Sequence, residues 1–157
     1  MRRYWMILML PVAAGLVAMN HWNADQTANE KAVRRAVMDY VEGFYEVKPE
    51  LLERGVSPQV KKMGYWRKEG EAEYQGPAHM TYDQARELAG NWNVDDRQGT
   101  DLKYEVEVFE VADKIACAKV TAKWGFDYFQ LVKEEDGWKI HHVLWQSHPP
   151  ETDATDR

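Results

Sequence analysis

The sequence contains a single cysteine, Cys117, among 157 residues. One cysteine cannot form an internal disulfide bond, even in an oxidising compartment. A lipoprotein anchor is also excluded, because no cysteine follows the apolar residues near the start of the chain. Cys117 alternates with polar and charged residues in a predicted strand, and lone cysteines of this kind commonly act as small packing residues. We therefore interpret it as structural.

Basic residues are outnumbered by acidic ones. The chain has 20 Lys and Arg residues against 26 Asp and Glu residues, which gives a formal net charge of −6. Without the two positive charges of Arg2 and Arg3, the charge falls from −6 to −8. An acidic domain without a basic stripe is poorly suited to nucleic acid or to an anionic membrane surface. We therefore expect no nucleic-acid partner and no polyanionic ligand.

The common catalytic and metal-binding motifs are missing as well. The sequence has no Gly-x-Ser-x-Gly elbow, no P-loop and no dinucleotide-binding fingerprint, so nucleophilic and nucleotide-dependent chemistry has no support. His79, His141, His142 and His148 show no metal-ligand spacing, and no carboxylate pair accompanies them. We expect neither a metal nor a cofactor.

The most apolar run, YWMILMLPVAAGLVAM, covers residues 4–19 and is short for a membrane span. At ~1.5 Å per residue it would cover roughly 24 Å, against ~30 Å for the hydrocarbon core of a bilayer. It follows Arg2 and Arg3 and precedes a polar stretch, which is typical of a secretory signal peptide. No clean cleavage site is present. Residues 1–23 therefore predict a signal peptide or an N-terminal membrane anchor, with a buried helix as the remaining alternative. Either of the first two places the domain in the periplasm or outside the cell.

Helical patterns follow this segment. Thr27 and Glu30 match a capping box, and apolar residues from Val33 to Phe44 then recur at helical spacing, which predicts a helix ending near residue 47. Pro49 suits the first position of a short second helix over residues 49–54. Residues 56–80 predict a loop with an edge strand or hairpin, and a second capping box at Thr81 opens a third helix.

After Gly99 the apolar period changes from 3.6 to 2, which indicates strands. LKYEVEVFEV and KIACAKVTAKW alternate apolar and polar residues, and FDYFQLVKEEDG leads through an Asp-Gly turn into WKIHHVLW, a hairpin signal. The tail, residues 147–157, is polar and predicted to be disordered. Helices followed by antiparallel strands predict one α+β domain, residues 24–146, with the helices on one face of the sheet.

This layout resembles the nuclear transport factor 2-like superfamily, whose members end in an element like DGWKI. The strings MTYDQARELAGNWN and DYFQLVKEEDGWKIHHVLW are similar to its lumazine-binding-like branch. The resemblance implies a cone-shaped fold in which N-terminal helices pack on a curved antiparallel sheet around a hydrophobic cavity, and a homodimer formed through the sheet. The chain departs from the pattern common in the branch at three positions. Relatives often carry His at the positions of Ser57 and Gln130, and often carry Asn at the position of His142. A polar constellation used by relatives is therefore not intact.

The adjacent histidines of the last strand can be separated by geometry. Successive strand residues point to opposite faces, so Trp138, Ile140, His142 and Leu144 share one face and His141 lies on the other. The two imidazoles cannot converge on one ion. If the apolar face looks into the cone, His142 lines the pocket.

In the preceding strand we place Tyr128 and Gln130 inside, because Asp127 needs water or a partner such as a salt bridge to Lys123. Aromatic walls would come from residues in the helices and at the strand ends. The alternative is that these aromatics only pack the core, since large aromatics dominate cores. The predicted ligand-binding residues are Tyr40, Trp92, Trp124, Tyr128, Gln130, Trp138 and His142.

The sequence thus predicts an exported domain that binds a small apolar or aromatic molecule without catalysing a reaction. The alternative is an isomerase, cyclase or dehydratase with His142 as general base and Tyr128 or Gln130 polarising a carbonyl. A third hypothesis is a protein-interaction module that exposes His141, Val143 and Trp145 on the outer sheet face.

Overall fold

The computed structural model describes residues 12–68 and 70–150, with side chains described from residue 24 onward. The helices are α1 (Val12–Tyr45), α2 (Pro49–Gly55), α3 (Tyr82–Ala89) and the short 3-10 helix η1 (Val94–Asp96). The strands are β1 (Val56–Trp66), β2 (Gln75–Met80), β3 (Glu105–Val111), β4 (Ile115–Ala122), β5 (Gly125–Glu134) and β6 (Gly137–Gln146). The run of strands expected after Gly99 is confirmed, and the hairpin expected over residues 56–80 is formed by β1 and β2, which lie between α2 and α3.

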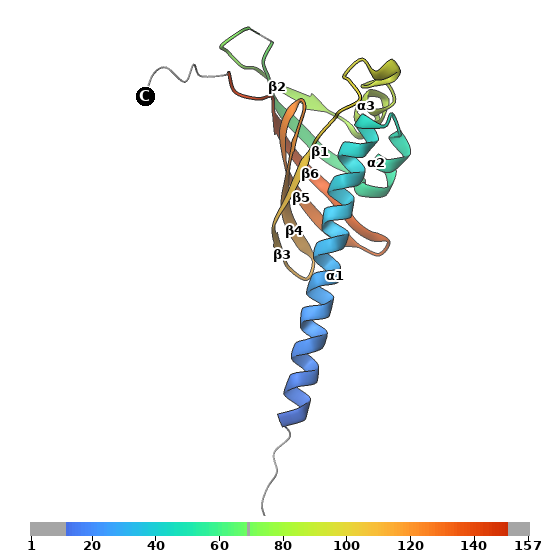
Figure 1. Cartoon of the computed structure of the whole chain (residues 1–157), viewed down its shortest axis with the longest axis vertical. Helices are drawn as coiled ribbons and strands as arrows, with labels where there is room; N and C mark the ends of the chain where they lie inside the picture. Colours follow the sequence, from blue (N-terminus) through green and yellow to red (C-terminus); the bar gives the residue numbers. More distant parts are fainter. Residues whose placement is uncertain (1–11, 69, 151–157) are drawn as a thin grey trace, which may run out of the picture.

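The strands form one curved sheet in the order β2-β1-β6-β5-β4-β3, and the helices lie on one side of it (Figure 1). The α+β architecture is confirmed. The expectation of an antiparallel sheet holds for every pair in it except β1 and β6, which run parallel. The reason is that α2 delivers the chain to β1 at the end where β6 begins, since Val56 pairs with Ile140.

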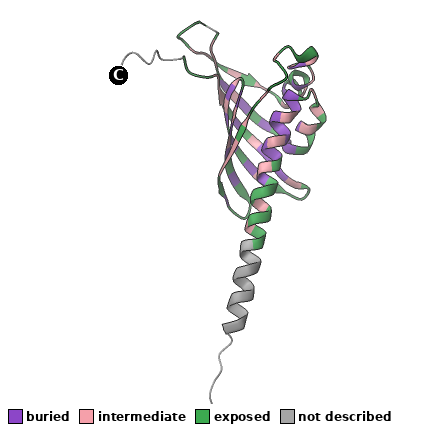
Figure 2. Ribbon diagram, in the orientation of Figure 1, coloured by how far each residue is buried: buried purple, intermediate pink, exposed green. Residues whose placement is uncertain are grey.

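Helix α1 crosses the concave face of the sheet, and its buried residues form one stripe (Figure 2). The predicted apolar positions from Val33 to Phe44 are all in that stripe and are buried. The predicted start at Thr27 is wrong, because α1 begins at Val12 and no proline interrupts it before Tyr45. Within the described residues, no helix combines the length and apolar character needed to cross a membrane. Residues 1–11 of the predicted leader lie outside the described residues.

The narrow end of the cone is closed by polar side chains of α1. Gln26 donates from Nε2 to the carbonyl oxygen of Val111 at 2.6 Å. Asn29 accepts hydrogen bonds from Lys133 Nζ at 2.8 Å and Trp138 Nε1 at 3.3 Å. These contacts tie α1 to the β3–β4 and β5–β6 turns.

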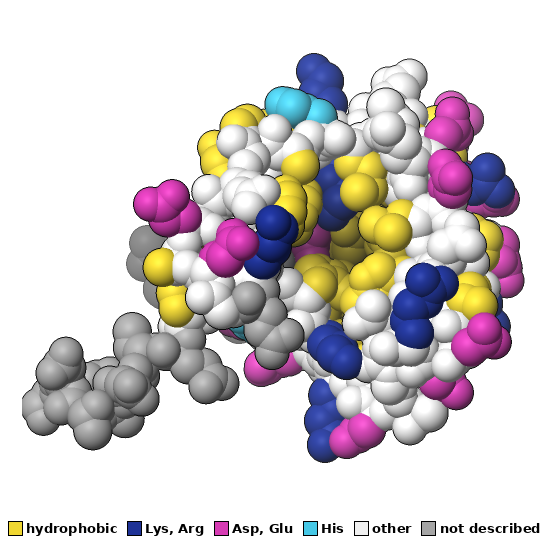
Figure 3. Space-filling model, turned by 90° about the horizontal axis from the view of Figure 1, so that it is seen from above, with side chains coloured by type: hydrophobic (Ala, Val, Ile, Leu, Met, Phe, Trp, Pro, Cys, Tyr) yellow, Lys and Arg dark blue, Asp and Glu magenta, His cyan; other side chains and the backbone are white. Residues whose placement is uncertain are grey.

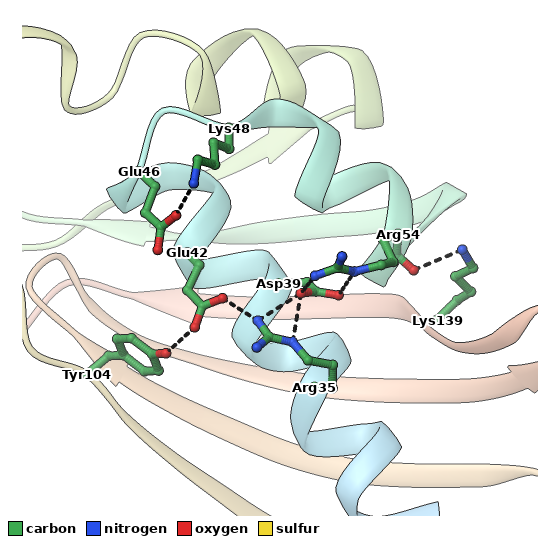
Figure 4. Close-up of polar contacts among 8 residues, drawn as sticks. All are labelled: Arg35, Asp39, Glu42, Glu46, Lys48, Arg54, Tyr104 and Lys139. Atoms are coloured by element: carbon green, nitrogen blue, oxygen red, sulfur yellow. Dashed lines mark hydrogen bonds and ion pairs between the residues drawn. The ribbon is translucent and has the colours of Figure 1, made fainter.

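Helices α1 and α2 are joined by a charged network (Figure 4). Asp39, only 1% exposed, accepts hydrogen bonds from Arg35 Nε at 2.8 Å and Arg54 Nε at 2.6 Å. Arg35 also pairs with Glu42, which accepts a 2.6 Å hydrogen bond from the hydroxyl of Tyr104. The network therefore fixes the angle between the two helices and links α1 to the segment that precedes β3.

The sheet contains a bulge that reverses the faces of β6. Ile140 pairs with Leu131 and His142 with Gln130, so His141 is an extra residue with no partner in β5. A bulge of this kind shifts the alternation by one position. Val143 and Trp145 consequently face the helices, and His142 and Leu144 face outward.

Candidate functional site

A cavity of about 170 Å³ lies at the open end of the cone, between the sheet and the helices. We call it the aromatic cavity. Figure 3 looks into this end of the molecule and shows a hollow surrounded mainly by hydrophobic side chains. Every layer of the fold contributes to the wall, so the cavity depends on the tertiary structure and not on one segment. The lining residues are Tyr40, Phe44, Lys62, Met80, Leu88, Trp92, Trp124 and Trp145.

Three polar side chains at one side of the cavity form what we call the buried triad, Tyr40, Lys62 and Asp127. Lys62 Nζ lies 2.6 Å from the Tyr40 hydroxyl oxygen and 3.1 Å from Asp127 Oδ1. The Tyr40 hydroxyl donates to the same carboxylate oxygen at 3.1 Å. Lys62 is 8% exposed and Asp127 is fully buried. An ionisable pair at this depth survives only because each charge is paired and hydrogen-bonded.

Trp124 completes the shell around the carboxylate. Its Nε1 donates to Asp127 Oδ2 at 2.6 Å. Both oxygens of Asp127 are therefore occupied by protein donors, and Asp127 itself does not line the cavity. Its role in the geometry is to hold Lys62, Tyr40 and the Trp124 indole in place.

Burial changes the acid–base properties of the triad. Burial lowers the pKa of the Lys62 ammonium, because a charged group is disfavoured away from water, and the opposing charge of Asp127 offsets part of that effect. Burial also raises the pKa of the Tyr40 hydroxyl well above its ordinary value, and the neighbouring Asp127 charge raises it further. Tyr40 is thus a neutral donor at every physiological pH.

The indole of Trp145 forms the wall next to Lys62. Lys62 Nζ lies 5.2 Å from the centroid of the Trp145 ring, which is within cation–π range. Gly64 of β1 makes room for this indole, since a Cβ at position 64 would overlap the Trp145 ring and its carbonyl oxygen. The Trp145 Nε1 is buried and has no hydrogen-bond partner among the described residues.

The opposite wall is an aromatic stack that reaches the surface. Trp92 stacks on Tyr45 with ring centroids 5.4 Å apart, and it meets Trp124 edge to face at 5.2 Å. The hydroxyl of Tyr45 donates to the Lys103 carbonyl oxygen at 3.1 Å and accepts from the Lys123 backbone N–H at 2.7 Å. These two hydrogen bonds hold the Tyr45 end of the stack, and the Trp124 indole at the other end is held by its hydrogen bond to Asp127.

The predicted pocket residues separate into two groups. Tyr40, Trp92 and Trp124 line the aromatic cavity, as expected. Trp138 is buried but lies at the closed end, where it contacts Asn29. The structure places the remaining three, Tyr128, Gln130 and His142, on the exposed outer face of the sheet.

The expected inward orientation of those three residues is wrong for two reasons. In β5, Asp127 points inward because the buried triad supplies its partners, so Tyr128 and Gln130 point outward. The expected salt bridge from Asp127 to Lys123 is replaced by the one to Lys62. In β6, the bulge at His141 moves His142 outward. It also brings Val143 and Trp145 inward, which removes them from the outer face proposed for protein interaction.

Sequence reasoning missed Lys62, Asp127 and Trp145. A signal for the first was present, because Val60, Lys62 and Gly64 alternate with outward residues in β1 and put a lysine on an otherwise apolar face. Asp127 stands out in the sequence as an acid within an aromatic strand, but nothing local places a lysine opposite it. The position of Trp145 depends on the bulge, which leaves no local signature in the sequence.

A larger hollow of about 540 Å³ adjoins the cavity along β1, β2 and the start of α3. It shares only Lys62 and Met80 with the aromatic cavity, and its other lining residues include Gln59, Lys61 and His79. It lacks tryptophan walls and a buried charged group of its own. The aromatic cavity is therefore the better candidate for a specific site.

Comparison with known proteins places the fold. The family model described as "Putative lumazine-binding" matches residues 28–146, and no curated protein matches the chain. A solved structure of an NTF-2 like protein of unknown function from Silicibacter pomeroyi is 20% identical, with a TM-score of 0.62, over 78% of this chain and 98% of that one. An NTF2-like protein of unknown function from Shewanella baltica is 16% identical, with a TM-score of 0.56, over 78% and 96%.

A third similar structure carries the name of an enzyme, "Putative Scytalone Dehydratase", from Novosphingobium aromaticivorans. It is 15% identical, with a TM-score of 0.57, over 80% of this chain and 88% of that one. At these identities the likeness concerns the fold and not the activity. The nuclear transport factor 2-like fold expected from the sequence is confirmed.

Proposed function

We propose that this chain, which belongs to the family described as "Putative lumazine-binding", binds a small apolar or aromatic molecule in the aromatic cavity. The observation that carries the proposal is the wall made by Trp92, Trp124 and Trp145, three of the chain's seven tryptophans, around a space next to a buried charge. A concave apolar site with a few polar groups is the usual form of a small-molecule site.

The size of the cavity limits the ligand. A dry apolar cavity of about 150 Å³ holds benzene, so the 170 Å³ here fits a single ring with a small substituent. A larger molecule would have to project past Leu88 and Met80, which lie between the cavity and the neighbouring hollows. A one-ring head group is the part that the cavity can enclose.

The burial of Asp127 behind the cavity wall favours binding over catalysis. A general base must lie within hydrogen-bond reach of the substrate, and Asp127 is fully buried behind Tyr40, Lys62 and Trp124 and does not line the cavity. The enzyme alternative with His142 as base and Tyr128 as its partner loses its geometric support, because both side chains lie on the outer face. His142→Ala is therefore expected to leave ligand binding unchanged.

The proposal is tested by native mass spectrometry on the full chain purified from its own host, followed by binding measurements with the retained molecule. Leu88 lies at the mouth of the cavity and is 38% exposed, so Leu88→Trp would fill the space without disturbing the core. Leu144→Trp, at a 50% exposed leucine on the outer face, is the matched control. Loss of the ligand only in Leu88→Trp supports the proposal, and equal retention in both variants contradicts it.

We also propose that the domain is exported and that residues 1–23 act as the signal or the anchor. The support is the sequence pattern of two arginines before an apolar run. Cell fractionation combined with the mass of the mature N-terminus tests this. An intact Met1 in a cytoplasmic fraction would contradict it.

A homodimer through the outer sheet face is proposed on the basis of exposed apolar side chains there. Phe109, Tyr128 and Leu144 are each about half exposed or more, and Phe109 lies 6.3 Å from the Tyr128 ring. Leu144→Asp is expected to convert a dimer to a monomer in sedimentation velocity. Leu88→Asp puts the same charge on the helical side and should leave the sedimentation coefficient unchanged.

A further inference from the structure

The buried lysine beside the aromatic cavity is already occupied by the protein. Its ammonium is hydrogen-bonded to the Tyr40 hydroxyl and the Asp127 carboxylate. Lys62 Nζ also lies over two aromatic rings, 5.3 Å from the centroid of Tyr40 and 5.2 Å from that of Trp145. A polar group that finds no partner in an apolar space is costly. The part of a ligand that this cavity encloses is therefore apolar.

A ligand longer than one ring has to leave the cavity, and two adjoining hollows could receive it. The hollow of about 540 Å³ along β1 and β2 shares Lys62 and Met80 with the cavity. Another, of about 380 Å³, lies between β2 and α3 and shares Met80 and Leu88. We call it the α3 hollow. Its lining residues are His79, Met80, Gln84, Glu87, Leu88 and Asn91.

The route into the α3 hollow is closed by side chains that can turn, whereas the route along β1 is closed by one that is fixed. Lys62 is held by its ion pair with Asp127 and its hydrogen bond to Tyr40. Leu88 is 38% exposed, and Met80 has an unbranched side chain with three rotatable bonds. We call Met80 and Leu88 the gate, because rotation of their side chains joins the cavity to the α3 hollow.

The main chain on the Met80 side of the gate is held in place, so the side chain can move alone. Met80 pairs with Lys62 across β1 and β2. The next residue, Thr81, is the N-cap of α3. Its hydroxyl accepts from the Gln84 backbone N–H at 3.3 Å, and its own N–H donates to the Gln84 side chain at 2.8 Å. The side chains at positions 80 and 88 therefore set the width of the opening.

The α3 hollow differs from the cavity in the chemistry of its wall. Gln84, Glu87 and Asn91 bring amide and carboxylate groups to it, and none of its described lining residues is lysine or arginine. A hydrogen-bonding group finds partners there. A second negative charge would be repelled by Glu87.

We propose that the ligand is a single aromatic ring with an unbranched chain that passes between Met80 and Leu88. The chain ends, in the α3 hollow, in a polar group that carries no negative charge. Met80 and Leu88 determine specificity, because a branch on the chain next to the ring meets the gate. The inference rests on the proposed function of the aromatic cavity and adds the chemical class of the molecule.

The test uses phenylbutanol, which has a phenyl ring at one end of an unbranched chain and a hydroxyl at the other. Toluene supplies the ring alone, and phenylbutanoate has a carboxylate in place of the hydroxyl end. A branched phenylbutanol carries a methyl group on the carbon next to the ring. Dissociation constants for the full chain are measured by isothermal titration calorimetry. Wild type should bind phenylbutanol about tenfold more tightly than toluene, because chain methylene groups are buried, and more tightly than phenylbutanoate or the branched alcohol.

The variants fill one hollow at a time or widen the gate. Glu87→Trp fills the α3 hollow from an exposed position outside the cavity lining, and Lys61→Trp, exposed in the hollow along β1, is the matched control. The affinity for phenylbutanol should fall about tenfold in Glu87→Trp only, and that for toluene should be unchanged in both. Met80→Ala should raise the affinity for the branched alcohol several-fold relative to the unbranched one. Leu144→Ala, on the outer face, should leave that ratio unchanged.

The possible failures are distinguishable. No binding of toluene or phenylbutanol to wild type would overturn this inference together with the proposed function. Equal affinities for these two probes would overturn the inference and leave the aromatic cavity as a binding site. So would a loss of phenylbutanol in Lys61→Trp in place of Glu87→Trp, which directs the chain along β1, or tighter binding of phenylbutanoate than of phenylbutanol. An unchanged ratio of the branched to the unbranched alcohol in Met80→Ala would overturn the gate.

Discussion

Removing one charge of the Lys62–Asp127 pair should destabilise the fold far more than removing both. Each side chain is almost completely buried, and each is the other's only counter-charge within hydrogen-bond distance among the described residues. Breaking a buried pair by taking away one partner typically costs about 3–5 kcal/mol, whereas replacing both partners is often close to neutral. The pair therefore offers a double-mutant cycle with a large expected coupling.

The free energy of deprotonating the lysine that is left behind sets an upper limit on the stability lost in Asp127→Asn. In that variant the isolated ammonium can lose its proton. An ordinary lysine pKa lies roughly 3.4 units above pH 7, and each unit corresponds to about 1.36 kcal/mol, so the cost is at most ~4.6 kcal/mol. In Lys62→Met the buried carboxylate is left without its counter-charge. The hydrogen bonds from Tyr40 and Trp124 remain in that variant, so about 3 kcal/mol is expected. The double variant keeps an amide oxygen as acceptor and should lose only about 1–2 kcal/mol.

The assay is urea unfolding followed by far-ultraviolet circular dichroism, with the slope m as a check that the unfolded state is unchanged. The coupling energy of the cycle should be about 3 kcal/mol or more. The stability of Asp127→Asn should also depend on pH. Burial lowers the pKa of Lys62, and this variant removes the charge that offsets the effect. The unfolded chain then binds the lysine proton more readily than the folded one, so stability rises with pH below about 10. Additive single losses, or a stability of Asp127→Asn that does not rise with pH, would refute the view of these residues as one buried ion pair.

Three further outcomes are expected. Asp39→Ala should cost about 2 kcal/mol in urea unfolding, since it removes the acceptor of two arginines, whereas Glu46→Gln, at an exposed pair with Lys48, should leave the midpoint unchanged. Burial and the hydrogen bond to Glu42 raise the pKa of Tyr104, and burial also raises the pKa of Tyr40. Both hydroxyls therefore ionise at a lower pH in the unfolded chain than in the folded one, and stability should fall as pH rises above about 10. The fall should be less steep in Tyr104→Phe, and an identical dependence of stability on pH in that variant would contradict this. Deleting His141 removes the extra residue of the bulge and keeps Trp145 inward, so the domain should tolerate it. Deleting Leu144 turns Trp145 outward, so it should unfold the domain or cost several kcal/mol of stability. Equal losses of stability in thermal melts of the two variants would contradict the assigned register.

The elements of this fold could be predicted from the sequence because their periods are strong and local. The stripe from Val33 to Phe44 has one helical solution, and Thr81 with Gln84 forms the capping box that starts α3. The Asp136-Gly137 turn placed the β5–β6 hairpin correctly. The start of α1 was misjudged, because a capping-box sequence is also compatible with the interior of a helix when no proline stops it.

The faces of the strands were harder to predict than the strands themselves. A bulge adds one residue without any required sequence signature, so nothing in HHVLW distinguishes a regular strand from one that slips at His141. The orientation of β5 depended on whether Asp127 had a partner, and that partner, Lys62, is 65 residues away in sequence. An orientation that depends on such long-range pairing cannot be predicted from local alternation. The pairing sets the outward direction of Tyr128 and Gln130, and the bulge sets that of His142.

The buried triad is also the strongest reason to regard the cavity as functional. A core that only needed stability would do as well or better with apolar residues at positions 62 and 127, because the desolvation of two charges offsets most of their attraction. The chain instead keeps Lys62 and Asp127 beside an apolar space. Gly64 is free of a side chain where the Trp145 indole passes, and the buried indole N–H has no partner among the residues that the structure describes. Departures from the most stable arrangement that gather at one cavity are expected at a binding site and have no purpose in a packing core.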